Sequence, residues 1–323
     1  MRGICWGVLL CVGLFFVGSV SAGEPTWEGV EFAKVGEVSL KLDLYLPEGA
    51  GRREGVEGKT RGLPPLVVYV HGGAWRAGSR GKPPVSDWTS LGFAVASVDY
   101  RLSTMDRFPA QIHDIKAAIR YLRAHHERLQ IDTSVIAIVG SSAGGHLAAL
   151  VGVTNGDREL EGTVGDHLEQ SSDVQAIVSY YGASNLETIL SQSTPHGLSV
   201  RVPALELLLG GQPEKVVALA KQASPVTHVD KSDPPLLLVH GDQDRQMPVN
   251  QSLELQGAYE AVNRPVTLQV LHGSGHGGAE FYAPPARDVA IEFLNRHLRE
   301  RRGSRDESSS SATPQGVRDV GRR

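Results

Sequence analysis

A serine between two glycines lies near the middle of the chain, where Gly140, Ser142 and Gly144 form a Gly-x-Ser-x-Gly pattern. The residues before it, 134–139, are apolar and mostly β-branched, and those after it, 147–151, are typical of a helix. At such a strand-to-helix turn the serine hydroxyl projects beyond the end of a sheet, and the N-terminus of the next helix favours negative charge there. Ser142 is therefore predicted to be a nucleophile.

A serine hydroxyl becomes a nucleophile at neutral pH only when a base removes its proton. The candidate base is His276, which lies between glycines after the last expected strand. The candidate acid is Asp244, which follows the preceding strand and would hold the imidazole in the useful tautomer. His272 and Asp242 are the competing choices, because each lies on the same loop as the favoured residue. The order serine, aspartate, histidine, with each residue after a separate strand, predicts acyl transfer by a catalytic triad.

A second glycine pair follows the strand expected at residues 66–70, within the segment His71-Gly-Gly-Ala-Trp75. Acyl transfer builds negative charge on a carbonyl oxygen, and backbone N–H groups must already point towards that oxygen. The predicted donors of this oxyanion hole are Gly73 and Ala74, together with Ala143 directly after the nucleophile. Trp75 would either line the substrate pocket or pack the loop.

The remaining polar residues do not indicate another chemistry. The histidines and carboxylates lack the spacing typical of a metal site, and no glycine-rich loop is followed by the lysine that phosphate binding needs. Asp99, Arg101 and Asp114 are expected to be structural, because an arginine near a strand end usually pairs with a carboxylate. We therefore expect neither a metal nor a cofactor.

The elements that would position these residues alternate between strands and helices. Two strands of alternating polarity are expected at 30–34 and 37–45, and apolar strands at 66–70, 93–98, 134–139, 174–180, 236–239 and 266–271. Helices are expected from Pro109, after Ser142, at 251–262 and at 285–298. The pattern predicts an α/β fold with a mainly parallel sheet of about eight strands flanked by helices, and a site at the carboxyl ends of the strands. Residues 182–228 are expected to form a small cap of short helical pieces.

The N-terminal residues 1–22 are predicted to be a signal peptide. A basic start is followed by an apolar run at 4–17 and by small residues ending at Ala22. This run is shorter than a membrane span needs, so no stable membrane insertion is expected after cleavage, an uncleaved anchor being the alternative. Both cysteines lie in this peptide, which excludes disulfides and thiol chemistry from the mature chain. The protein is expected to be exported to the periplasm or beyond the cell.

The C-terminal residues 301–323 are predicted to be a disordered tail, because they are rich in serine and charge and lack apolar periodicity. The tail holds six basic and three acidic residues, whereas the whole chain has a formal net charge of −4. The folded part is therefore more acidic than the whole chain. This charge argues against a nucleic-acid partner.

Taken together, the motifs resemble those of secreted α/β-hydrolases of the esterase and lipase type. The resemblance is strongest to the bifunctional feruloyl and acetyl-xylan esterase-like group, abbreviated BD-FAE. It rests on His71-Gly-Gly-Ala-Trp75, Val98-Asp-Tyr-Arg-Leu102, Phe108-Pro-Ala-Gln-Ile112, Gly140-Ser-Ser-Ala-Gly-Gly-His-Leu147, His240-Gly-Asp-Gln-Asp244 and Gly275-His276-Gly277. It covers residues 27–299 and implies one catalytic domain with the α/β-hydrolase fold. In that family's pattern the aspartate of His-Gly-x-x-Asp is the acid, which implies Asp244.

The predicted function is hydrolysis of carboxylic esters through an acyl-enzyme on Ser142. The resemblance implies small-acyl esters, or acetyl and feruloyl esters of polysaccharides, as substrates. An exo-peptidase or amidase is the alternative, because peptidases of this fold share the His-Gly-x-x-Asp loop. A non-catalytic binding protein that kept the fold is a third hypothesis, and it would require a damaged triad or a filled pocket.

Overall fold

The computed structural model describes residues 23–50 and 62–299. The predicted signal peptide, 1–22, and the predicted tail, 301–323, lie outside the described residues. None of the helices formed by the described residues combines the length and the apolar character needed to cross a bilayer.

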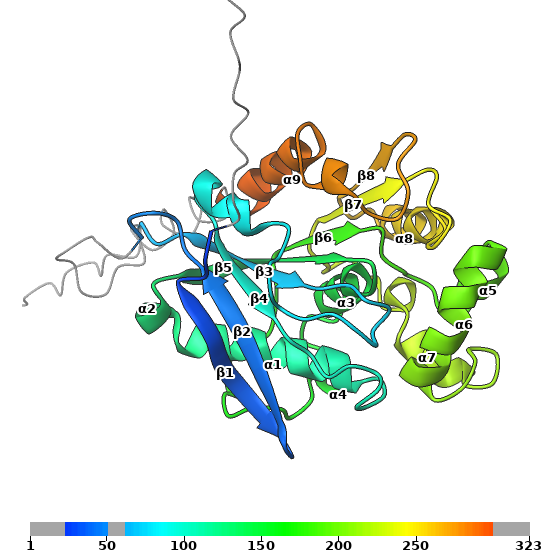
Figure 1. Cartoon of the computed structure of the whole chain (residues 1–323), viewed down its shortest axis with the longest axis horizontal. Coiled ribbons are helices and arrows are strands. Elements are labelled where there is room, and N and C mark those ends of the chain that lie inside the picture. Colours follow the sequence, from blue (N-terminus) through cyan, green and yellow to red (C-terminus); the bar gives the residue numbers. More distant parts are fainter. Residues whose placement is uncertain (1–22, 51–61, 300–323) are drawn as a thin grey trace, which may run out of the picture.

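Eight strands form one sheet in the order β1-β2-β4-β3-β5-β6-β7-β8 (Figure 1). β2 pairs antiparallel with β1 on one side and with β4 on the other. From β4 onwards, in the spatial order β4-β3-β5-β6-β7-β8, all neighbouring strands pair parallel. This arrangement confirms the mainly parallel sheet of about eight strands. The bounds are β1 Trp27–Val35, β2 Val38–Tyr45, β3 Pro65–Val70, β4 Ala94–Val98, β5 Asp132–Ser141, β6 Ala176–Tyr180, β7 Leu236–Gly241 and β8 Val266–Leu271.

Helices cover both faces of the sheet (Figure 1). One apolar core joins the sheet to α1, α3 and α8, and a second joins its other face to η1 and α9. Because β3 to β7 are covered on both faces, their side chains are buried, which accounts for their uninterrupted apolar sequence. The bounds outside the cap are η1 Ser86–Leu91, α1 Ala110–Ala124, α2 His126–Leu129, α3 Ala143–Gly152, α4 Arg158–Glu161, α8 Asn250–Ala261, η3 Ala279–Phe281, α9 Ala286–Leu294 and the π-helical turn η4 Asn295–Arg299.

The segment between β6 and β7 is called the cap below. It holds the helices α5 Ile189–Gln192, α6 Pro195–Leu209, α7 Val217–Gln222 and η2 Pro225–Thr227. The main one, α6, is longer than the short pieces that its sequence predicts. Thr194 begins it, since its Oγ1 accepts the N–H of Gly197 at 3.0 Å, and Gly210 ends it with a φ of 76°. Its apolar residues follow no clean stripe, so periodicity alone did not reveal its length.

Side chains of α8 and α5 tie the cap to the sheet domain. The Oε1 atom of Gln251 accepts the N–H groups of Ser184 and Asn185 at 2.8 and 2.9 Å. Its amide nitrogen lies 2.9 Å from Oε1 of Gln192 in α5. Because Gln251 is completely buried, these bonds fix the position of the first half of the cap over α8.

A buried ion pair supports the loop after β4. Arg101 donates from Nε and Nη2 to the carboxylate of Asp114 at 2.8 and 2.7 Å, as the sequence suggested for a structural pair. Replacing Asp114 with alanine leaves a buried guanidinium without its main partner. We expect the free energy of unfolding to fall by about 3 kcal/mol in urea titrations. The exposed pair of Glu292 with Arg296 is the control, and Glu292→Ala should change the value by less than about 0.5 kcal/mol.

Candidate active site

The turn between β5 and α3 holds Ser142 in a strained conformation, with φ 55° and ψ −119°. A Cβ added to Gly140 would lie 2.1 Å from the carbonyl oxygen of Gly144, and one added to Gly144 would lie 2.0 Å from that of Val70. Both flanking glycines are therefore required by close backbone contacts. The neighbouring Ser141 is turned elsewhere, since its Oγ lies 2.8 Å from the hydroxyl of Tyr69.

This close contact gives a stability prediction. Gly144→Ala should lower the free energy of unfolding by about 3 kcal/mol or more, because the atoms it meets belong to the backbone and cannot rotate away. Gly257 in α8 is the matched control, since a Cβ there meets nothing within 4 Å. Gly257→Ala should instead raise stability by about 0.5–1 kcal/mol, the helix-propensity difference. Equal effects of the two changes in urea titrations would contradict the packing argument.

Three side chains from three loops form a continuous relay. The Nε2 atom of His276 lies 2.8 Å from Oγ of Ser142, and its Nδ1 atom lies 2.7 Å from Oδ2 of Asp244. With the proton on Nδ1, the imidazole donates to the carboxylate and accepts from the serine hydroxyl. The structure thus brings together the three residues that the sequence favoured. This arrangement can activate Ser142 for attack on a carbonyl carbon.

The carboxylate of Asp244 is held as an anion. Its Oδ1 accepts the N–H groups of Gln246 and Met247 at 2.8 and 2.7 Å. Burial alone would raise the pKa of Asp244, but interactions with His240, His276 and the Met247 amide hold it well below the usual range. An ionised Asp244 keeps the proton on Nδ1 of His276, which leaves Nε2 free to act as the base.

The competing pair lies apart from the serine. The Nδ1 atom of His272 lies 2.8 Å from Oδ2 of Asp242, and Oδ1 of the same carboxylate accepts the N–H of Gly273. His272 is largely exposed, and this pair closes the loop after β8 rather than facing Ser142. Of the two histidine–aspartate pairs on these loops, only the pair of His276 with Asp244 therefore reaches Ser142.

The predicted oxyanion loop lies against the nucleophile. A Cβ added to Gly72 would be 3.3 Å from Cβ of Ser142. The next two residues, Gly73 and Ala74, both have positive φ, 112° and 51°. Among the described residues, the N–H groups of Gly73, Ala74 and Ala143 have no hydrogen-bond acceptor. Free donors on both sides of Ser142 suit the stabilisation of a developing oxyanion.

Trp75 serves the packing of this loop. Its side chain is completely buried, and its Nε1–H donates to Nδ1 of His146 at 3.1 Å. Burial lowers the pKa of His146 to about 4, so the ring is neutral, and its Nε2–H donates to the carbonyl of Ala223 at 2.6 Å. Trp75 therefore exposes no surface to an open pocket, and of its two expected roles the structure shows loop packing.

Several residues beside the triad had no role assigned from the sequence. Tyr181 directly follows β6 with φ 40°, and its ring meets that of His276 edge-on at 4.8 Å. His240 is the penultimate residue of β7 and holds the acid loop, with Nε2 3.0 Å from the carbonyl oxygen of Met247 and 3.4 Å from Oδ2 of Asp244. The histidine of the His-Gly-x-x-Asp motif was the available signal for His240. Tyr181 lies outside the motifs, so only its three-dimensional position reveals it.

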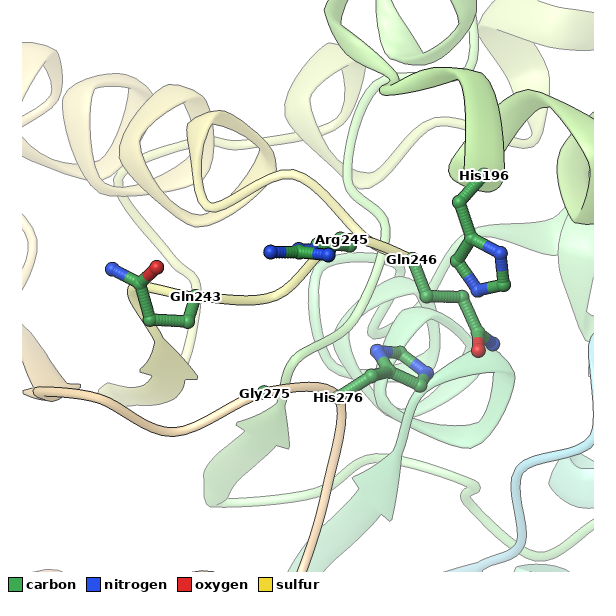
Figure 2. Close-up of a pocket in the computed structure, with 6 residues that line it drawn as sticks. All are labelled: His196, Gln243, Arg245, Gln246, Gly275 and His276. Carbon is green, nitrogen blue, oxygen red and sulfur yellow. The ribbon is translucent and has the colours of Figure 1, made fainter.

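An open cavity of about 450 Å³ adjoins the triad histidine (Figure 2). It is lined by His196, Gln243, Arg245, Gln246, Gly275 and His276. Its walls therefore come from the acid loop, the histidine loop and the N-terminal end of α6. Among the triad residues, His276 lines this cavity, so a molecule held in it would lie beside the catalytic imidazole.

Comparison with known proteins places this site in a family. The BD-FAE family model matches residues 42–259. The esterase LipC of Mycobacterium tuberculosis is 34% identical over 247 residues, which are 73% of this chain and 59% of LipC. This chain spans about half the length of the curated relatives that it matches.

Solved structures agree with the fold. A truncated carbohydrate esterase from gut microbiota has a TM-score of 0.71 and 32% identity, over 84% of this chain and 95% of that chain. The esterase Est2 of Thermogutta terrifontis, with butyrate bound, has a TM-score of 0.64 and 26% identity, over 84% of this chain and 93% of that chain. These findings confirm the fold predicted from the sequence, and the relatives named here are esterases. The chain belongs to the BD-FAE family of α/β-hydrolase esterases.

Proposed function

We propose that the whole protein is a carboxylic ester hydrolase that works through an acyl-enzyme on Ser142. His276 takes the serine proton as Oγ attacks the ester carbonyl, and the N–H groups of Gly73, Ala74 and Ala143 hold the oxyanion. His276 then gives that proton to the departing alcohol, which leaves the acyl group on Ser142. His276 then removes a proton from a water molecule as the water attacks this second ester, and it returns that proton to Oγ of Ser142 as the acid is released.

The observation that carries this proposal is the relay from Ser142 through His276 to Asp244. Its two contacts, 2.8 and 2.7 Å, are both of hydrogen-bond length. A non-catalytic protein of this fold would have no need for a strained serine at the elbow, nor for unpaired N–H donors beside it.

The proposed substrates are esters with a small acyl group, or acetyl or feruloyl esters of polysaccharides. Two solved neighbours support this range, one named as a carbohydrate esterase and one holding butyrate. The side chains of Gln243, Arg245 and Gln246 in the cavity beside His276 can form hydrogen bonds with a hydroxylated leaving alcohol.

The test is hydrolysis of p-nitrophenyl acetate, butyrate and octanoate, of a feruloyl methyl ester and of acetylated xylan. We expect turnover that is fastest with the short chains, and acetate release from the xylan. Turnover of dipeptidyl anilides, with all esters left intact, would instead assign the same triad to a peptidase. Fast cleavage of octanoate with slow cleavage of acetate would contradict the small-acyl assignment.

We also propose that the protein is exported, on the basis of the apolar run at 4–17 alone. Expression of the full chain in a bacterial host, followed by N-terminal sequencing of the product, checks this. The expected new N-terminus is Gly23. A product that keeps Met1 and stays with the membrane fraction would indicate an uncleaved anchor.

A further inference from the structure

A buried arginine of the cap lacks a counter-ion. Arg201 lies in α6 and exposes none of its surface. Its Nη2 reaches the carbonyl oxygen of Gln246 at the long distance of 3.4 Å, and its guanidinium carbon lies 5.9 Å from the centre of the Trp75 ring. Its Nε and Nη1 have no hydrogen-bond partner among the described residues. Arg201 therefore keeps two of its donor groups unused in the interior.

Such an arrangement is costly unless it serves a ligand. Buried charges in proteins are normally paired, and buried N–H donors normally have acceptors. The buried Arg101, by contrast, has both Asp106 and Asp114 as partners. Contact with the Trp75 ring favours the cation, but it provides no oxygen acceptor for the guanidinium N–H groups.

The carboxylate that attracts Arg201, that of Asp244, is already engaged by other groups. Burial lowers the pKa of Arg201 to about 10, attraction by Asp244 opposes this, and repulsion by Arg76 adds to it. Arg201 is thus charged at neutral pH. The oxygens of Asp244 are taken by His276 and by two backbone N–H groups, and no ion pair with Arg201 forms among the described residues.

Two more arginines lie around the same space. Arg76 follows the oxyanion loop and is close enough to Arg201 for their charges to repel. Arg245 follows the triad aspartate and lines the cavity beside His276 (Figure 2). Neither makes a salt bridge with any carboxylate of the segments that the structure describes. Arg201 thus interacts electrostatically with Asp244 and Arg76, and Arg245 shares a cavity wall with His276, in a chain whose formal net charge is −4.

We propose that Arg201, with Arg76 and Arg245, binds a carboxylate of the substrate, so that the preferred esters carry a negative charge near the scissile bond. The planar guanidinium presents two N–H groups that match the two oxygens of a carboxylate. Because Arg201 exposes no surface while α6 is in place, binding includes an outward shift of α6 from Trp75. This inference rests on the proposed ester-hydrolase function and narrows its substrate class.

The carboxylate can belong to either half of the ester, and two matched substrate pairs separate the halves. For the acyl half, mono-p-nitrophenyl glutarate is compared with p-nitrophenyl pentanoate. For the alcohol half, acetylated methyl glucuronoside is compared with acetylated methyl xyloside by acetate release. In one pair we expect kcat/KM to be at least about tenfold higher for the anionic member, the contribution typical of hydrogen bonds to a charged group.

Arginine variants then test whether Arg201 and Arg245 cause the preference for the anionic substrate. In Arg201→Gln, the ratio of kcat/KM for the anionic and neutral members should fall by about 10- to 100-fold, and Arg201→Lys should keep part of it. Arg245→Gln, on an exposed loop, should lower the ratio without a risk to folding. Arg296→Gln, in the exposed π-helical turn, is the control and should leave the ratio unchanged. Glutarate should also inhibit hydrolysis of the neutral ester by the wild type more strongly than butyrate does.

The outcomes separate this inference from the function on which it rests. Turnover of the neutral esters with no preference for either anionic one would overturn the carboxylate site and leave the esterase in place. A preference that survives in Arg201→Gln, Arg201→Lys and Arg245→Gln would also overturn it. Failure to hydrolyse any ester would remove the proposed function and this inference together.

Discussion

Ser142→Ala is expected to lower kcat for p-nitrophenyl butyrate by about 10⁶-fold, the loss typical of removing a triad nucleophile. The physical reason is that no other described group can form the acyl intermediate at this position. Ser142 is the residue whose Oγ lies 2.8 Å from Nε2 of His276. The remaining activity would reflect only the oxyanion donors and substrate binding. Initial rates by p-nitrophenolate release, with enzyme in large amounts for the variant, provide the measurement.

The adjacent serine is the matched control for this change. Ser141→Ala removes the same atom one residue earlier in the chain, where Oγ bonds to Tyr69 instead of His276. We expect kcat of Ser141→Ala to stay within about tenfold of the wild type, since it loses one buried hydrogen bond. A loss of the same size in both variants would indicate collapse of the turn, and the assignment of the nucleophile would not stand. Retention of full activity in Ser142→Ala would refute it directly.

Asp244→Asn is expected to lower kcat by about 10⁴-fold at neutral pH. The asparagine keeps the size of the side chain, but its amide can donate to Nδ1 of His276. That would place the imidazole proton on Nε2, where it faces Ser142 and blocks removal of the serine proton. The loss should therefore appear mainly in kcat, with KM changed little, because Asp244 lies behind His276 and is almost fully buried.

Asp242→Asn provides the control on the same loop. Asp242 pairs with the exposed His272, and this pair does not reach Ser142. Its replacement should change kcat by less than about twofold. A large loss in Asp242→Asn together with a small one in Asp244→Asn would transfer the role of the acid to the competing pair. Steady-state kinetics of the two variants on the same ester decide between these results.

The two positions chosen for the stability predictions, Gly144 and Asp114, are buried for different physical reasons. Gly144 is constrained by the close approach of two backbones, and Asp114 by the charge that it neutralises. Asp114 takes no part in the relay, whereas Gly144 belongs to the turn that holds Ser142. Asp114→Ala should therefore lower activity only in proportion to the folded fraction, which circular dichroism and kinetics on the same samples can show. Gly144→Ala should lower activity further, because the added Cβ meets the backbone of Val70 and His71 at the start of the oxyanion loop.

The sequence by itself determined the elements and the kinds of residue at the site. Apolar runs bounded by turns predicted the parallel strands, because such strands are buried on both faces. The pattern around Ser142 predicted the elbow, since close backbone contact at Gly140 and Gly144 is a local constraint that leaves a local signature. The glycines before Trp75 and the His-Gly-x-x-Asp motif are local signals of the same kind.

Tertiary structure alone decided which candidates meet. Two histidines and two aspartates on adjacent loops are equivalent in type, and only the closing of a 134-residue separation places His276 on Ser142. The length of α6 was likewise set by its caps and by burial against the sheet domain, not by its periodicity. Two nitrogens of Arg201 are unpaired because of how α6 packs against the Trp75 loop and the Gln246 loop, and no local sequence pattern encodes that packing. Local motifs thus specify which residue types the site contains, whereas contacts between distant segments decide which of these residues bind one another.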